Sequence, residues 1–373
     1  MMCKLSDICE FVKGKVAVST ITKLNYISTE NMLPNRGGIV EAATLPSTDT
    51  TQIYSSGDIL VSNIRPYFKK IWFADTNGGC SNDVLVFRAK QGVNPIYLYY
   101  ILSDDKFFNY ATATSKGTKM PRGDKVAIMA YEIEKHTCQQ QDVIASILKP
   151  LDDKISLNRE INNNLAEQAM TLFKHYYDLA TDEVNFTDLI QILGGGTPKT
   201  STESYWNGEI PFFTPKDVGN PYVLTTEKYI TDDGLAHCNS RLYPINTVFV
   251  TARGTVGKVS MPGVPMAMNQ SCYALVGKEI PQLLVYFYTM QTVAKLKHKA
   301  MGAVFDAITT RDFETEQIKK LDGASIMSFI SAVEPIYGEI LVLTKECQQL
   351  SALRDALLPK LMSGELDVSE VEI

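Results

Sequence analysis

Two apolar helical stripes constrain the fold of this chain more than any other feature. Segments 144–173 and 329–358 align without a gap at a constant offset of 185 residues, so that Pro150 matches Pro335. In each segment, apolar residues recur every three or four positions, which is the spacing of a coiled-coil seam. Such a stripe is unfavourable in water, and the pattern therefore predicts that the two helices pack on each other.

Two asparagines interrupt the first stripe. Because a buried asparagine lowers stability but specifies register and partner in a coiled coil, we expect Asn158 and Asn162 to set the register of the helix pair. The alternative is that the helix face opens there and both side chains are solvated. In the second stripe, Arg354 fits the pattern poorly. The predicted helix–helix and subunit interface comprises Leu151, Ile155, Asn158, Asn162, Leu165, Leu172, Ile336, Ile340, Leu343, Leu350 and Leu357.

The sequences before the two stripes also resemble each other, more faintly. Residues 57–88 and 245–277 each contain a β-rich run, an arginine (Arg65 or Arg253), a lysine five residues further on, a second β-rich run and a polar loop with an asparagine. The predicted fold class is therefore α+β. Two globular mixed α/β domains are separated by two long antiparallel coiled-coil helices, with an internal pseudo-twofold repeat.

The repeat predicts four segments along the chain. The first globular domain covers 1–138 and the first helix covers 139–180, whereas the second globular domain covers 181–323 and the second helix, with its tail, covers 324–373.

Composition limits the class of protein. With 373 residues and 45% hydrophobic side chains the chain can form two cores, but no run of about 20 apolar residues predicts a membrane span. The seven cysteines are scattered and odd in number, which favours a reduced, cytoplasmic protein. The net charge of −6 does not favour a nucleic-acid-binding protein, although the distribution of charge matters more than its sum.

No catalytic motif is recognised in the sequence. The stretch GGGTPKT (194–200) fails as a nucleotide-binding P-loop, because Pro198 stands before Lys199 and lacks the N–H that such a loop directs at phosphate. The four histidines show no metal-binding spacing, and LDDK (151–154) lies within the helical stripe, where a solvated helix face is expected. We therefore expect no catalytic residue, metal, cofactor or small-molecule substrate.

Loop residues of both globular domains instead suit nucleic acid, because Lys, Arg and hydroxyl groups bind phosphates and Arg, Asn and Gln read base edges. In the second domain the candidates are Thr197, Lys199, Thr200, Lys216, Arg253, Gly254, Thr255, Lys258, Asn269 and Gln270. In the first domain they are Arg65, Tyr67, Lys69, Lys70, Asn82, Lys119 and Arg122. We expect Trp206 and Phe212 to lie in the core, whereas the run KLKHK (295–299) faces either phosphate or solvent.

Three stretches of the second domain identify a family. GGGTPKTSTESYWNGEIPFFTPKDVG (194–219), VFVTARGTVGKV (248–259) and MNQSCYAL (268–275) resemble the target-recognition domain of specificity subunits of type I restriction-modification systems. The resemblance covers nearly the whole chain and is most specific over 187–277. The first domain has FVKGKV (11–16) where the second has its GG-T-P stretch, so its DNA contacts transfer less directly.

The resemblance implies a non-catalytic subunit that reads a bipartite, asymmetric site on double-stranded DNA with two recognition domains. It implies that the helices form the antiparallel spacer and bind two methyltransferase subunits, and that restriction subunits with translocase activity complete the enzyme. The methyltransferase would then supply much of the positive field that this acidic chain lacks. The alternatives are the specificity partner of another, type II-like restriction system, an enzyme with an unrecognised site, and a coiled-coil scaffold.

Overall fold

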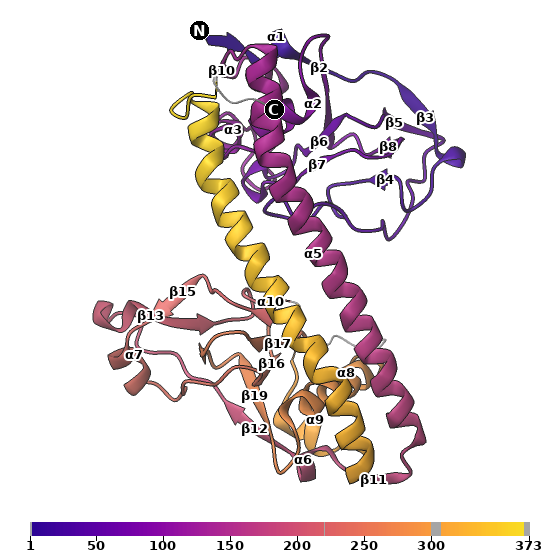
Figure 1. Ribbon diagram of the computed structural model, residues 1–373, viewed down its shortest axis with the longest axis vertical. Coiled ribbons are helices and arrows are strands. Elements are labelled where there is room, and N and C mark those ends of the chain that lie inside the picture. The colour runs from indigo at the N-terminus through magenta and orange to yellow at the C-terminus, as the bar shows by residue number, and fades with distance from the viewer. Residues whose placement is uncertain (1, 220, 300–306, 369–373) are drawn as a thin grey trace. The chain divides into compact units, whose positions relative to one another are not determined.

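The computed structural model describes residues 2–219, 221–299 and 307–368 and has the predicted mixture of helices and sheets (Figure 1). The α+β class is thus confirmed.

The chain divides into two compact units. Unit 1 contains residues 1–155 and 349–373, and unit 2 contains residues 156–348. Each unit has one globular part and segments of both long helices, α5 (Cys138–Leu179) and α10 (Gly323–Met362).

Unit 1 contains two four-stranded sheets and a strand pair. The first sheet has the order β2 (Cys9–Phe11), β9 (Val84–Ala89), β6 (Ile59–Ser62), β7 (Ile71–Phe73). The second has the order β3 (Lys15–Ala17), β5 (Thr50–Tyr54), β8 (Gly78–Cys80), β4 (Tyr26–Ile27). Strands β1 (Met2–Lys4) and β10 (Glu132–Glu134) pair antiparallel. The short helices are α1 (Leu5–Ile8), α2 (Pro95–Ser103), α3 (Asp105–Ala113) and α4 (Lys125–Met129).

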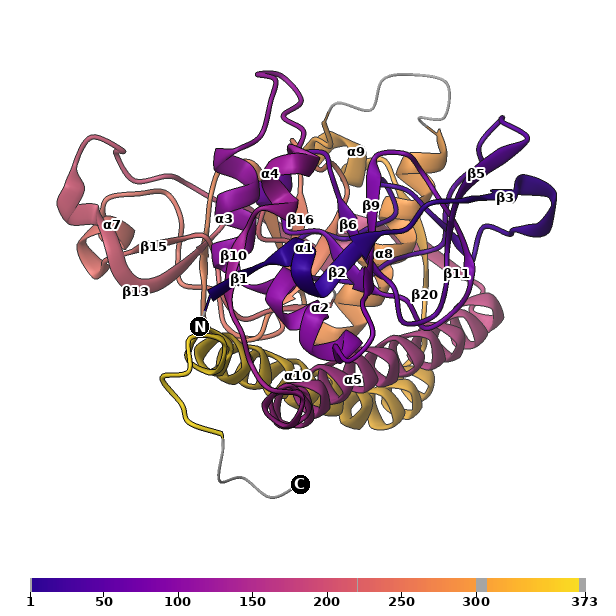
Figure 2. The ribbon, with the colours of Figure 1, turned by 90° about the horizontal axis from the view of Figure 1, so that it is seen from above.

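Unit 2 contains a five-stranded sheet, a three-stranded sheet and a strand pair. The larger sheet has the order β12 (Ile190–Gly194), β19 (Cys272–Gly277), β16 (Val248–Thr251), β17 (Val259–Pro262), β14 (Tyr222–Val223). The smaller has the order β15 (Lys228–Ile230), β13 (Trp206–Phe213), β18 (Ala267–Met268), and it lies with α7 (Asp232–Ala236) away from α8 (Gln282–Lys299) (Figures 1 and 2). Strands β11 (Asp182–Asn185) and β20 (Gln317–Lys320) pair antiparallel, and α6 (Phe186–Leu189) and α9 (Thr310–Glu314) complete the unit.

The two units share a strand order. The order β2-β9-β6-β7 in unit 1 corresponds to β12-β19-β16-β17 in unit 2, and the central strands β6 and β16 are buried throughout. Burial on both faces explains the apolar residues ILV of β6 and VFV of β16, and each strand ends in a buried hydroxyl residue, Ser62 or Thr251. In both units, the strand of this sheet that comes last in the sequence is followed by a helix that packs on the sheet: α2 follows β9, and α8 (Gln282–Lys299) follows β19.

The helix that follows β9 begins where the sequence places a proline. Asn94 caps α2, because its side chain accepts hydrogen bonds from the backbone N–H groups of Ile96 (2.8 Å) and Tyr97 (3.3 Å). Pro95 stands at the first helical position, where its missing N–H removes no helical hydrogen bond. The stretch NPIY (94–97) therefore forms the start of α2.

Within unit 2, α5 and α10 are joined by polar contacts as well as apolar ones. The side-chain amide of Asn158, which is fully buried, donates to Glu346 Oε2 (2.7 Å), and that of Asn162 donates to Thr344 Oγ1 (3.3 Å). The alternative of an open helix face with solvated asparagines is therefore wrong, and the register role stays a prediction. The amide oxygens of both residues are buried and accept no hydrogen bond from the described residues.

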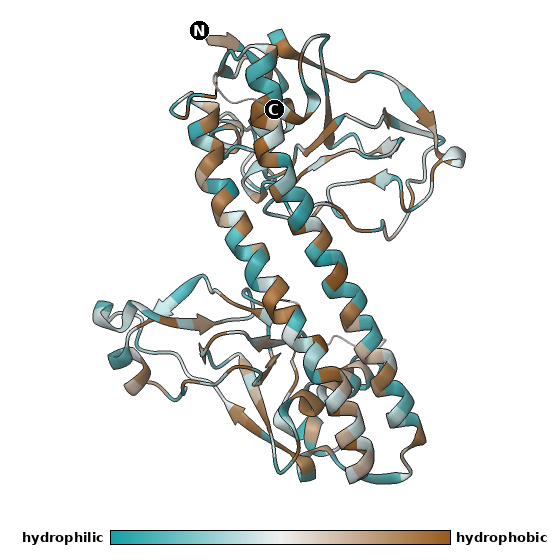
Figure 3. Cartoon of the chain, in the orientation of Figure 1, coloured by the Kyte–Doolittle hydropathy of each residue, from teal (hydrophilic) through white to brown (hydrophobic). Residues whose placement is uncertain are grey.

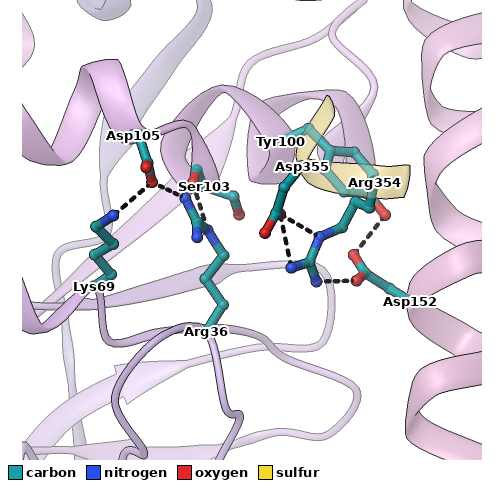
Figure 4. A network of polar contacts seen from close by, with 8 residues as sticks. All are labelled: Arg36, Lys69, Tyr100, Ser103, Asp105, Asp152, Arg354 and Asp355. Atoms are coloured by element: carbon teal, nitrogen blue, oxygen red, sulfur yellow. Dashed lines mark hydrogen bonds and ion pairs between the residues drawn. The ribbon is translucent and has the colours of Figure 1, made fainter. Parts of the chain in front are cut away.

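Within unit 1, the poorly fitting arginine has a partly buried partner (Figure 4). Arg354 Nη1 donates to Asp152 Oδ1 (2.6 Å), and Tyr100 of α2 donates to Asp152 Oδ2 (2.8 Å). The side chain of Asp152 is only 22% exposed, so the prediction of a solvated helix face over 151–154 is wrong at this position. Arg354 is compatible with the stripe because its charge is paired there.

Helix α10 is long and apolar enough to cross a membrane, by length and composition alone. Some of its apolar residues belong to hydrophobic cores, namely Phe329, Val333 and Ile340 in unit 2 and Leu358 and Leu361 in unit 1, whereas others, such as Met327 and Val342, are exposed. Apolar and polar positions alternate around both long helices (Figure 3). This is the pattern of a helix that packs on a domain rather than one that faces lipid on all sides.

Candidate nucleic-acid interface

The β16–β17 loop (252–258) of unit 2 exposes three of the predicted DNA contacts. Arg253, Thr255 and Lys258 have exposed side chains. Gly254 and Gly257 have φ angles of +85° and +70°, a region that side chains disfavour, and this explains the glycines in the stretch ARGTVGK.

Hydrogen bonds from its backbone to β16 and to a neighbouring loop hold the β16–β17 loop in place. The Lys258 backbone N–H donates to Thr251 Oγ1 (3.0 Å), and the Arg253 N–H donates to the carbonyl oxygen of Ser271 (3.3 Å). The second bond brings the arginine next to the β18–β19 loop (269–271). There Gln270 is exposed, whereas the Asn269 side-chain oxygen accepts a bond from the Ser271 N–H (3.0 Å). Asn269 therefore shapes its loop, and Gln270 presents its side chain to solvent.

The glycine-rich stretch before Lys199 serves close packing. A Cβ on Gly195 would lie 2.2 Å from the carbonyl oxygen of Asn269, and one on Gly196 would lie 2.6 Å from the backbone nitrogen of Asn239. Side chains larger than glycine are therefore excluded at both positions. The next residue, Thr197, donates a hydrogen bond to Gln270, so the stretch lies against the β18–β19 loop.

The remaining polar candidates of unit 2 lie at the surface. Lys199, Thr200 and Lys216 are exposed, and Lys216 forms an ion pair with Glu227 (3.5 Å). The neighbouring aromatic residues are internal: Phe212 is buried, and Trp206 packs edge-on against it with ring centroids 5.6 Å apart. The expectation that these two residues belong to the core is confirmed for Phe212, while Trp206 is half-buried.

The corresponding β6–β7 loop (63–70) of unit 1 has fewer free cations. Arg65 has a φ of +50°, and its buried Nε has no hydrogen-bond partner among the described residues, whereas Tyr67 is exposed. Lys69 pairs with Asp105 (2.8 Å), and the Lys70 ammonium donates to the carbonyl oxygen of Thr29 (2.6 Å). Both lysines were predicted as DNA contacts, and the structure engages both within the unit.

The electrostatics agree with this geometry. Burial lowers the pKa of Lys70 below its ordinary value. Burial would raise the pKa of Asp105, but hydrogen bonds from Lys69 and then Arg36 outweigh it and lower that pKa overall. The carboxylate of Asp105 is thus held ionised by the cations around it.

The other candidates of unit 1 are exposed. Asn82 and Lys119 have exposed side chains, and Arg122 pairs with Asp83 (3.1 Å). Asn82 also lines a cleft of about 420 Å³ with three lysines that the sequence reasoning missed, Lys13, Lys15 and Lys125. Lys13 and Lys15 lie in the FVKGKV stretch (11–16), whereas Lys125 belongs to α4, and only the fold brings it to the same cleft.

The three lysines of the KLKHK run form contacts within unit 2. Lys299 pairs with the buried Glu316, and Lys295 donates to the carbonyl oxygen of Gln317 (3.2 Å), so both support the fold. Lys297 donates to the carbonyl oxygen of Gly257 (2.6 Å) and thus lies beside the β16–β17 loop. In the part of the chain that the structure describes, no group of His, Cys, Asp and Glu has a metal-binding arrangement.

The model of one protein family matches both globular parts. It is described as the type I restriction modification DNA specificity domain, and it matches residues 1–167 and 181–319. The chain belongs to this family. As a family member it has the domain twice, once at the start of each half of the sequence.

Individual relatives agree with the family. The chain is 23% identical to the HindI specificity subunit of Haemophilus influenzae, over 97% of this chain and 98% of that protein. It is 31% identical to the MjaIX specificity subunit of Methanocaldococcus jannaschii over 33% of this chain, a match that spans only 30% of that relative. The S subunit structure from M. genitalium has a TM-score of 0.56 at 16% identity, over 97% of this chain and 96% of that one, and therefore shares its fold.

Proposed function

We propose that this protein is the DNA sequence-recognition subunit of a type I restriction-modification complex. The observation that carries the proposal is the arginine-bearing loop between matching strands of both units, with Arg65 after β6 and Arg253 after β16. Two similar surfaces of this kind suit a bipartite site on double-stranded DNA, each unit reading one half.

The proposal assigns a role to each segment. Recognition domains occupy 1–138 and 181–323, and the helical segments 139–180 and 324–373 form an antiparallel coiled-coil spacer with pseudo-twofold symmetry. The spacer binds two methyltransferase subunits, and restriction subunits with translocase activity join them. The chain itself catalyses nothing. Two residue pairs between the helices, Asn158–Glu346 and Asn162–Thr344, support the antiparallel arrangement, because the residue number rises along α5 and falls along α10.

Lys69 and Lys70 are bound by Asp105 and Thr29 within unit 1, so we leave both out of the proposed DNA contacts. In unit 2 we retain Arg253, Thr255, Lys258 and Gln270 as the central set, with Lys199, Thr200 and Lys216 at the phosphate backbone. In unit 1 we retain Arg65, Tyr67, Asn82, Lys119 and Arg122. Thr197, Gly254 and Asn269 shape the loops.

A methylation assay tests the function. The purified chain with methyl donor and DNA should transfer no methyl groups, and adding a methyltransferase subunit should produce sequence-specific methylation of both half-sites. Arg253→Ala should weaken recognition of one half-site by about 1–3 kcal/mol, whereas Lys278→Ala, a charge loss elsewhere in unit 2, should leave it unchanged. Exchanging 187–322 for another such domain should change one half-site only. Methylation by the chain alone would refute the proposal.

A further inference from the structure

Unit 2 contains a cleft of about 640 Å³ beside the β16–β17 loop. Its apolar lining comes from Val218, Val259, Met290 and Val293, so strand β17 and helix α8 form much of its wall. Three lysines from separate parts of the chain line it as well: Lys216, Lys258 and Lys297. Apolar walls with convergent polar groups are typical of a ligand site.

The cations of this cleft are poorly neutralised. Among the described residues, neither Lys258 nor Lys297 forms an ion pair, and the ammonium of Lys297 donates to a neutral acceptor, the carbonyl oxygen of Gly257. Lys216 pairs with Glu227 at 3.5 Å, but both side chains are more than half exposed and such pairs are weak. Burial and the nearby charge of Lys258 lower the pKa of Lys297. An anion in the cleft would relieve this repulsion.

The corresponding place in unit 1 supplies its own anion. The β6–β7 and β16–β17 loops match in detail, because Ser62 N–H donates to the Lys70 carbonyl oxygen and Thr251 N–H donates to that of Lys258, both at 3.0 Å. In unit 1, Asp105 at the start of α3 faces this loop and binds Lys69 and Arg36 (Figure 4). In unit 1, Lys69 and Arg36 thus have a carboxylate partner and Lys70 donates to a carbonyl oxygen, whereas Lys258 and Lys297 of unit 2 have no carboxylate partner among the described residues.

We propose that the cleft of unit 2 binds a phosphate ester together with its sugar. Lys258 and Lys297 bind the phosphate, and the apolar wall of Val293 and Met290 contacts the sugar. The expected source is the backbone of the target DNA, and to that extent the inference rests on the proposed function. A free nucleotide has the same chemistry, and the two sources are distinguished below. Because unit 1 lacks this site, unit 2 would make a contact with the DNA backbone that unit 1 does not make.

The first arm of the test measures how salt affects binding. Lys297→Met and Lys258→Met are made in the full chain, which is assembled with its methyltransferase subunit and titrated with target duplex over a range of salt concentrations. Methionine keeps the apolar stem and removes the charge. Each variant should reduce the slope of log K against log salt by about 1, because one fewer phosphate is neutralised. Lys278→Met, an exposed lysine of unit 2 outside the cleft, should leave the slope unchanged.

The second arm tests the free nucleotide. Deoxyadenosine monophosphate and inorganic phosphate are titrated calorimetrically into the same complex without DNA. A reduced salt slope without nucleotide binding identifies the DNA backbone as the source. Nucleotide binding that Lys297→Met abolishes, with an unchanged slope, identifies a free nucleotide.

If neither quantity changes in Lys297→Met and Lys258→Met, the cleft is no phosphate site and the inference is overturned. Specific binding that still depends on Arg253 would in that case leave the proposed function intact. Conversely, a wild-type complex that binds DNA without sequence preference would refute the proposed function, and the nucleotide arm would still test the cleft.

Discussion

In unit 1 one contact between the helix pair and the globular part involves an ion pair, whereas in unit 2 the two corresponding positions are aromatic and aliphatic. At the offset of 185 residues, Asp152 corresponds to Tyr337 and Ala169 corresponds to Arg354. Asp152 and Arg354 form an ion pair that also binds Tyr100. Tyr337 and Ala169 are buried in the core of unit 2.

The difference shows that equivalent positions of the two helices can be occupied by a charged pair in one unit and by apolar side chains in the other. Burial would lower the pKa of Arg354, but Asp152 and Asp355 outweigh it and raise that pKa, so the guanidinium stays charged. In unit 2, the ring centroid of Tyr337 lies 5.6 Å from that of Tyr286 and 5.5 Å from that of Phe287, both edge-on. The ion pair orients the side chains that form it, whereas aromatic packing stabilises the contact through buried apolar area and complementary shape.

The comparison can be tested because each unit contains one of the two tryptophans. Trp72 lies in β7 of unit 1 and Trp206 in β13 of unit 2. Trp206→Phe and Trp72→Phe backgrounds therefore allow fluorescence to report the unfolding of each unit separately.

The largest effect is expected in unit 2. Tyr337→Ala should lower the free energy of unfolding of unit 2 by about 3–5 kcal/mol, because it leaves a cavity among aromatic rings. Urea unfolding followed by Trp206 fluorescence measures this. Tyr337→Phe is the control and should cost less than about 1.5 kcal/mol, since the ring remains. Equal losses in the two variants would mean that the hydroxyl, and not packing, matters at this junction.

Arg354→Met should destabilise unit 1 by about 2–3 kcal/mol, because it leaves the Asp152 carboxylate without its cation. The loss is below that of a fully buried pair, since the Asp152 side chain is 22% exposed. Trp72 fluorescence during urea unfolding measures it. A loss under about 0.5 kcal/mol would show that solvent screens the pair.

Asp152→Asn should have opposite effects in two backgrounds. In the wild type it removes the partner of Arg354 and should destabilise unit 1 by about 1–2 kcal/mol. In Arg354→Met it removes an unpaired charge and should recover about 1 kcal/mol, while the amide oxygen still accepts from Tyr100. The same Trp72 measurement applies, and additive losses in the double variant would refute a direct ionic interaction.

The smallest effect is expected at Asp105, whose side chain is 57% exposed. Asp105→Asn should cost unit 1 less than about 1 kcal/mol at neutral pH. Because the folded pKa of Asp105 lies below its ordinary value of 3.8, its contribution is present above that pH and is lost as the pH falls through the folded pKa. Stability curves of wild type and variant from pH 6 to pH 2.5 should therefore converge at the acidic end. A constant difference would exclude this carboxylate as the cause.

Much of the candidate site could be predicted from local patterns. The glycine spacing in ARGTVGK and the polar stretch MNQ mark loops wherever they occur, and the structure exposes Arg253 and Gln270 there. Lys69 and Lys70 appeared equivalent to Lys258, because the partners that engage them, Asp105 and Thr29, are distant in sequence. Lys297 could not be assigned for the same reason, since its contact with Gly257 depends on how α8 packs.

The sequence by itself determined the α+β class, the two long helices and the family, because periodicity, glycine spacing and motifs are local properties of the chain. Only the tertiary structure decided which charges are free. It paired Arg354 with Asp152 and Lys69 with Asp105, and it left Lys258 and Lys297 without a described carboxylate. The physical reason is that an ion pair depends on distances of a few ångströms. Asp152 and Arg354 are 202 positions apart in the sequence, and only packing sets the distance between them.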